Sequence, residues 1–224
     1  DLEVNDLLLT ALGTALHRWS GQQRVLVNLE GHGREAIVPE LDITRTVGWF
    51  TSQYPVLLEV DGQAEAGQRI KQVKENLRQV PQKGIGYGLL KYLSAEAANF
   101  ALHLQPEISF NYLGQFDQDL DQGAIALSSH SGGEPMSEHT LLEQPLNVNG
   151  MITAGVLTLE IRYDSNTFEQ HSVEHFAKLL KESLHEVISH CVAKERSELT
   201  PSDVLYKGLS LKQLEQLMLE TAGI

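Results

Sequence analysis

The stretch "RVLVNLEGHGREAI", residues 24–37, joins an apolar segment to a loop crowded with ionisable side chains. The short run of branched apolar residues predicts a β-strand over 24–29. Directly behind it, two glycines separate Glu30, His32 and Arg34. A scaffold presents side chains at a strand end rigidly into a cleft. The residues alone therefore leave two interpretations open, a catalytic loop and a charged turn.

Strands and helices are mixed along the rest of the chain without strict alternation. Apolar residues at helical spacing predict helices, and short apolar runs between turn signals predict strands. We expect helices at 4–19, 64–80, 89–100 and 168–192, strands at 54–60, 107–114, 143–152 and 155–163, the last two paired as a hairpin, and a glycine-rich turn at 84–88. This order predicts an α/β or α+β sandwich built on one sheet.

Composition narrows the class of protein. Seventeen Lys and Arg stand against thirty Asp and Glu, and the net charge of −13 argues against a nucleic-acid partner. No apolar run approaches the roughly 18 residues of a membrane span, so no membrane partner is expected. Cys191 is the one cysteine, which excludes an internal disulfide and favours a cytoplasmic location.

Candidate chemistry concentrates at two strand ends. The histidine pair His171 and His175 does not fit the His-Glu-x-x-His zinc-protease pattern, because Ser172 and not a glutamate follows the first histidine, and no metal site is expected. Glu30 at a strand end is suited to proton transfer if it is partly buried. In "FNYLG", residues 110–114, Asn111 and Tyr112 follow another apolar strand. They can donate to a developing oxyanion, or the tyrosine is simply buried with a backbone partner.

Four motifs stand in order along the chain: "EGHGRE" at 30–35, "RTVGWFTSQYPVLLE" at 45–59, "PQKGIGYG" at 81–88 and "FNYLGQF" at 110–116. Together they closely resemble the signature motifs of epimerization domains of nonribosomal peptide synthetases, within the condensation-domain superfamily. The resemblance spans nearly the whole chain. It implies a chloramphenicol-acetyltransferase-like sandwich, a mixed β-sheet flanked by helices, as one lobe of a two-lobe domain. Residues 1–196 would form the C-terminal lobe.

The remaining residues, 197–224, are expected to be a C-terminal tail or linker. A polar stretch at 193–203 contains Pro201, which is typical of a boundary. The segment at 209–219 has the spacing of a short amphipathic helix. Two roles stay open for this helix: it docks onto a downstream synthetase, or it merely ends the chain.

The resemblance also implies a reaction, inversion of the Cα of an aminoacyl or peptidyl thioester from L to D. The substrate is expected on the phosphopantetheine arm of a peptidyl carrier domain, and this lobe itself is expected to bind no cofactor. By motif position, Glu30 matches the proposed acid/base of the family, and Arg34, Asn111 and Tyr112 match positions linked to activity. The expected substrate-binding residues are Gly31, His32, Gly33, Trp49 and Tyr87.

The chain departs from the family in one respect: it contains no His-His pair. The family's His-His-x-x-x-Asp motif belongs to an N-terminal lobe, and we expect that missing lobe, a carrier domain and adjacent synthetase modules as partners. The lobe alone is then expected to be inactive.

Two alternatives remain, a condensation domain that forms peptide bonds and a non-catalytic lobe that docks a carrier domain. For docking, the basic cluster Lys71, Lys74, Arg78 and Lys83 is a candidate, although such a cluster is also typical of a solvated helix face.

Overall fold

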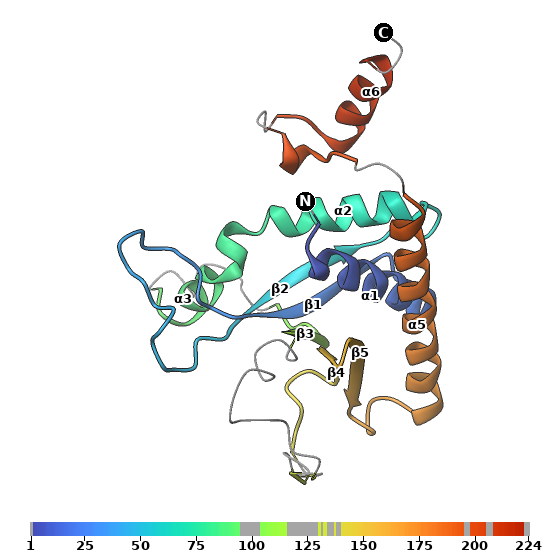
Figure 1. Ribbon diagram of the computed structural model, residues 1–224. Helices are drawn as coiled ribbons and strands as arrows, with labels where there is room; N and C mark the ends of the chain where they lie inside the picture. Colours follow the sequence, from blue (N-terminus) through green and yellow to red (C-terminus); the bar gives the residue numbers. More distant parts are fainter. Residues whose placement is uncertain are drawn as a thin grey trace.

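A five-stranded mixed sheet in the order β2-β1-β3-β4-β5 forms the centre of the molecule (Figure 1). The computed structural model describes residues 2–94, 104–115, 130, 132–133, 137, 140–194, 198–204 and 208–221. The strands are β1 (Arg24–Gly31), β2 (Ser52–Glu59), β3 (Ile108–Gln115), β4 (Leu146–Thr153) and β5 (Val156–Tyr163). The helices are α1 (Val4–Ser20), α2 (Ala66–Arg78), α3 (Gly86–Tyr92), α5 (Gln170–Ala193) and α6 (Leu211–Thr221), with short 3-10 turns η1 (Pro81–Gly84) and η2 (Pro201–Asp203).

The centre of the sheet is parallel and its two outer pairs are antiparallel. β1 runs antiparallel to β2 and parallel to β3, β3 is parallel to β4, and β5 returns antiparallel beside β4. The β4–β5 pair is the hairpin that the sequence predicts. In contrast, the parallel β1–β3 pair joins residues about eighty positions apart, which no local sequence signal announces.

Helices α1, α2 and α5 cover one face of the sheet, and Figure 1 shows them on the same side. Strand residues at alternate positions, such as Val27, Phe110 and Val148, point into this core and are almost fully buried. Between the helices, the ring of Trp19 on α1 lies 5.1 Å from the ring of Phe176 on α5. The core therefore lies between the sheet and these helices, as the sandwich prediction requires.

The opposite face of the same strands carries polar residues. Gln53 of β2 pairs with Glu30 of β1, and Asn111 of β3, Asn149 of β4 and Glu160 of β5 are in register with one another. Glu30 and Asn111 come directly after the last β1–β3 pair, Leu29 with Phe110. Because side chains alternate between faces, the strands that bury the core necessarily aim these residues to the other side. The sheet thus presents a polar surface on the face that the helices leave uncovered.

Element boundaries differ from the sequence prediction at two functionally important places. β1 continues to Gly31, so Glu30 lies within the paired strand and not in the loop behind it. In the expected turn at 84–88, helix α3 already begins at Gly86, and positive φ angles occur earlier, at Gln82, Lys83 and Gly84. Of the expected helix at 89–100, residues 95–100 lie outside the described part of the chain.

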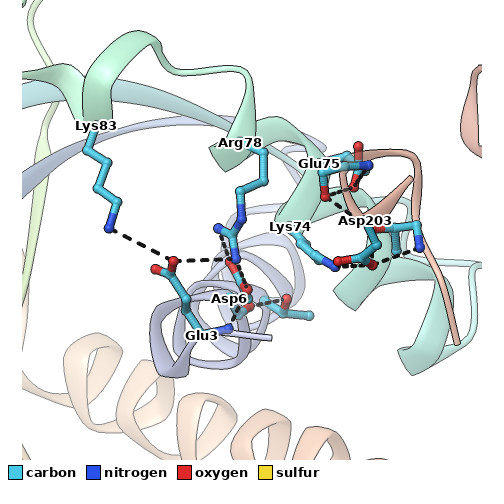
Figure 2. A network of polar contacts seen from close by, with 10 residues as sticks. Glu3, Asp6, Lys74, Glu75, Arg78, Lys83 and Asp203 are labelled. Carbon is cyan, nitrogen blue, oxygen red and sulfur yellow. Dashed lines mark hydrogen bonds and ion pairs between the residues drawn. The ribbon is translucent and has the colours of Figure 1, made fainter. Parts of the chain in front are cut away.

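Most of the predicted basic cluster is engaged within the chain, and Figure 2 shows Lys74 and Arg78 directed at acids of other elements, whereas Lys83 stays largely exposed. Arg78 donates to the fully buried Asp6 of α1, with Nη2 2.8 Å from Oδ2. Lys74 is almost fully buried and its Nζ lies 2.6 Å from Oδ2 of Asp203 in η2. Lys71 pairs at 2.8 Å with both Glu198 and Glu215. Helix α2 therefore binds α1 on one side and residues of 198–204 and α6 on the other.

Within the described residues, every helix is too short or too polar to cross a lipid bilayer.

We expect Asp203→Asn to lower the free energy of unfolding by about 3 kcal/mol, because the change leaves the buried Lys74 ammonium without its counter-charge. Chemical denaturation of the chain measures the effect. The double variant Lys74→Met/Asp203→Asn removes both charges but keeps a side-chain oxygen that accepts from Thr200, and it should recover most of the loss. Equal stability of the single variant and the unchanged chain would show that the pair does not hold the segment.

The pH dependence of the same segment follows from Glu198. Hydrogen bonds from Lys194 and Lys71 lower the pKa of this carboxyl to about 2. Since the folded pKa lies below the unfolded one, its stabilising contribution is complete above about pH 4.5 and is lost as the pH falls toward 2. An NMR titration of the Glu198 carboxyl should show this low midpoint, and Lys71→Met should raise it.

Candidate active site

Glu30 is the acidic residue at the centre of the candidate site, near the carboxyl end of β1. Antiparallel pairing places Gln53 of β2 opposite it, and parallel pairing places Asn111 of β3 on its other side. Asn111 donates from Nδ2 to Oε2 of Glu30 at 2.8 Å, and Gln53 donates from Nε2 to Oε1 at 3.2 Å. Both carboxylate oxygens are therefore held by neutral amides, one from each neighbouring strand.

The amide contacts extend one residue further, to Asn28. Its Nδ2 donates to Oε1 of Gln53 at 3.3 Å, which orients the Gln53 amide toward Glu30. Asn28 itself is buried. This arrangement fixes the direction of the Glu30 carboxylate without cancelling its charge, because every one of these partners is neutral. A positioned carboxylate of this kind is suited to accept or return a proton.

The loop behind Glu30 is held by Gly33 and Arg34. Gly33 has a φ of +66°, and a Cβ atom there would lie 1.5 Å from the carbonyl oxygen of Phe50, so only glycine fits. Arg34 donates from Nη1 to the Ile43 carbonyl at 2.7 Å, and its guanidinium lies 4.1 Å from the centre of the Phe50 ring. In this arrangement Arg34 fastens the 34–50 loop, and its guanidinium is engaged with that loop and not with Glu30.

His32 shapes the turn by local contacts. Its Nδ1 accepts the backbone N–H of Arg34 at 2.9 Å, and its Nε2 lies 3.1 Å from Oε1 of Glu35. Gly31, the neighbouring predicted site residue, lies close to the Ser52 hydroxyl of β2. Both residues line a cavity beside Glu30, so a part in substrate binding stays a prediction.

Two cavities meet at Glu30. The first, which we call the wide groove, has a volume of about 1340 Å³ and lies between the uncovered face of the sheet, the 33–51 loop and α3. The second, which we call the end cavity, has a volume of about 480 Å³ and lies where β1 and β3 end. Glu30 lines both. Its carboxylate is thus placed where a bound molecule can reach it from two directions.

The remaining predicted site residues divide between these cavities. Trp49 and Tyr87 line the wide groove, whereas Asn111 and Tyr112 line the end cavity. Strand alternation turns the Tyr112 side chain to the face opposite Asn111, where it packs against the core. The structure therefore brings Glu30 and Asn111 into direct contact, and it leaves Tyr112 at the wall of the end cavity.

Sequence reasoning missed two residues of the site, Gln53 and Tyr54. Gln53 is a polar residue inside an apolar strand, a signal that becomes informative only once its partner strand is known. Tyr54 lines the end cavity, and burial, followed by the negative charges of Glu35 and Glu3, raises the pKa of its phenol. Tyr54 therefore stays protonated and can donate a hydrogen bond.

A comparison with models of protein families shows the family to which the chain belongs. A family model described as "Condensation domain" matches residues 1–209. The chain belongs to the condensation-domain family. Among relatives, this family member is 53% identical over 216 residues to a mycosubtilin synthase component from Bacillus subtilis. It is 43% identical over 225 residues to gramicidin S synthase 1 of Brevibacillus brevis. Each alignment covers 96% of the chain, but only 8% and 20% of those relatives.

Solved structures support the same relationship. The epimerization domain from the third module of tyrocidine synthetase B matches with a TM-score of 0.78 and 43% identity, over 86% of this chain and 43% of that one. The expected resemblance to an epimerization domain is therefore confirmed, as is the mixed-sheet sandwich of chloramphenicol-acetyltransferase type, of which the chain covers one lobe. The first condensation domain of the CDA synthetase, at 13% identity and a TM-score of 0.52, shares the fold.

We expect Gly33→Ala to lower the free energy of unfolding by about 2 kcal/mol, because alanine strains the positive φ and collides with the Phe50 carbonyl. Limited proteolysis should then cut the 34–50 loop faster. Gly88→Ala is the matched control: Gly88 is helical with open space around it, so alanine should stabilise α3 by about 0.5–1 kcal/mol. Equal effects of both changes would contradict the role of Gly33 in holding the loop.

Proposed function

We propose that this condensation-family lobe supplies the Glu30 half of an epimerization site. The site would invert the Cα of an aminoacyl or peptidyl thioester that is carried on a phosphopantetheine arm. The observation that carries the proposal is the Glu30 carboxylate, which is held by Asn111 and Gln53 at the meeting point of two cavities. The 43% identity to an epimerization domain supports the reaction class.

The chemistry needs a base at this position. A thioester carbonyl acidifies the neighbouring Cα–H, and loss of that proton leaves an enolate whose negative charge rests on the carbonyl oxygen. Glu30 takes the proton on its carboxylate, and the Asn111 and Gln53 amides keep the carboxylate directed at one place while it does so. Delivery of a proton to the opposite face of Cα then gives the other stereoisomer.

A second acid/base is required for that delivery. We assign it to the N-terminal lobe and its His-His-x-x-x-Asp motif, because this chain contains no His-His pair. The other proposed partners are a peptidyl carrier domain and adjacent synthetase modules; one structural relative belongs to a four-domain nonribosomal peptide synthetase. No resident cofactor takes part in the proposed reaction, since the substrate brings its own phosphopantetheine thioester. The lobe alone should then be inactive.

Peptide-bond formation is the competing activity, because the matching family model describes a condensation domain. Both activities act on a carrier-bound thioester, but they leave different products. An epimerase exchanges the Cα–H with solvent and releases no new peptide, whereas a condensation domain joins two carrier-bound substrates. One assay with a loaded carrier therefore separates the two.

The test combines this chain with an N-terminal lobe and an L-aminoacyl carrier in deuterated water. Mass spectrometry and chiral analysis should detect Cα deuterium together with D-product. Glu30→Gln should slow the exchange by about 10²-fold or more, because glutamine cannot accept the proton. Asn111→Leu should slow it by about tenfold, since it removes one of the two donors that aim the carboxylate.

Glu160→Gln is the matched control. Glu160 lies in β5 on the same face of the sheet but lines neither cavity, so its removal should leave the exchange rate unchanged. Exchange that persists in Glu30→Gln would disprove the role of Glu30. Dipeptide without exchange would identify a condensation domain, and exchange by the lobe alone would disprove the need for a partner lobe.

A further inference from the structure

The wide groove is larger than a binding site around a single carboxylate needs to be. Its volume of about 1340 Å³ exceeds the roughly 300–1,000 Å³ of ordinary small-molecule sites. Asn28, Glu30 and Gln53 lie at its base, on the uncovered face of the sheet. A molecule whose reacting atom lies at Glu30 can therefore extend a large substituent into this space.

The walls of the wide groove are rich in exposed apolar surface. Trp49 of the loop is 91% exposed, and on or directly after α3, Leu89, Tyr92 and Leu93 are 54%, 72% and 77% exposed. Single exposed apolar residues are ordinary, but a contiguous set around a concave surface marks a binding site. These side chains gain burial when an apolar group lies between them.

The charge of the wide groove disfavours an acidic occupant. Among the described residues that line it, three are carboxylates, Glu30, Glu107 and Glu143, and one is a cation, Lys91. The Lys91 ammonium lies 5.1 Å from the centre of the Tyr92 ring and 5.8 Å from that of Tyr87, which are cation–π distances. An acidic substituent would meet this excess of negative charge, and like charges oppose its binding.

The end cavity offers a contrasting environment. Its lining includes Asp6, Arg78, Lys83 and Asn111, so its surface is more polar, and its volume of about 480 Å³ is smaller. Glu30 and Thr51 line both spaces. A Cα atom held at Glu30 would thus have an apolar space on one side and a polar space on the other, which suits an amino acid with an apolar side chain and a polar thioester and amide.

We infer that the wide groove holds the side chain of the residue whose Cα is inverted, and that it selects large apolar or aromatic side chains over acidic ones. The inference rests on the proposed epimerization at Glu30 and adds the class of amino acid to it. Trp49, Leu89 and Tyr92 are the specificity-determining residues, because they supply the apolar walls.

The first experiment compares substrates in the assembled two-lobe domain. Carriers loaded with L-phenylalanyl and L-aspartyl thioesters are followed by Cα–H exchange, and the phenylalanyl substrate should exchange about tenfold or more faster. Leu89→Asp should reduce that preference at least about tenfold. Leu90→Asp is the matched control, because Leu90 is similarly exposed on the same helix but does not line the groove, and it should leave the preference intact.

A second measurement uses this chain alone. Trp49 is exposed at the groove, whereas the other tryptophan, Trp19, packs in the core, so tryptophan emission reports on groove binding. The non-hydrolysable amide of L-phenylalanine with amino-pantetheine, in which NH replaces the thioester sulfur, should shift the emission to shorter wavelength, and the corresponding L-aspartyl amide should not. Trp49→Phe should abolish the shift.

The outcomes distinguish the reaction from the selectivity of the groove. Absence of exchange with every carrier substrate contradicts the proposed function. Exchange at equal rates for phenylalanyl and aspartyl substrates, or equal effects of Leu89→Asp and Leu90→Asp, overturns the selectivity of the groove and leaves the epimerase intact. Faster exchange of a lysyl than of a phenylalanyl substrate also overturns it, because the carboxylates and not the apolar walls would then select the side chain.

Discussion

The parallel pairing of β1 with β3 is the contact on which the candidate site depends. It places Asn111 beside Glu30, although 81 residues separate them along the chain, and it aims both side chains to the uncovered face of the sheet. A shift of one residue in this pairing would turn one partner toward the helices. The buried residues on the other face, such as Val27 and Phe110, make that shift costly, since it would expose them. The apolar core thereby fixes the geometry of the polar site.

The helices also have separate structural roles. α1 and α5 bury one face of the sheet, and α2 joins the N-terminal helix to the 198–221 segment through ion pairs of its own cations. Arg69 and Arg18 extend this scheme, since both contact Glu186 of α5. Charges that resemble a binding surface in the sequence therefore hold the molecule together. Among the described residues, the polar face of the sheet with its adjoining groove is left uncovered by these helices.

Much of the architecture was predictable because it follows from local patterns. Helical periodicity predicts α1, α2 and α5, and alternation predicts the β4–β5 hairpin, since both depend on neighbours within a few residues. The basic cluster of α2 was interpreted wrongly, because its ion-pair partners are not neighbours in the sequence. Spacing shows that Lys71, Lys74 and Arg78 lie along one helix, but their acidic partners are far away in sequence, and only the packing brings them together.

For the site, the sequence by itself determined which residue types are present: a glutamate at the end of a strand, two glycines in the loop behind it, and the motifs that mark the condensation-domain family. The tertiary structure decided how they act together. It showed that Asn111 contacts Glu30 while Tyr112 faces the core, that Arg34 is used to hold its own loop, and that Gln53 belongs to the site. The physical reason is that strand register is set by the burial of a whole sheet face. The residues buried on that face come from segments that lie far apart in the sequence.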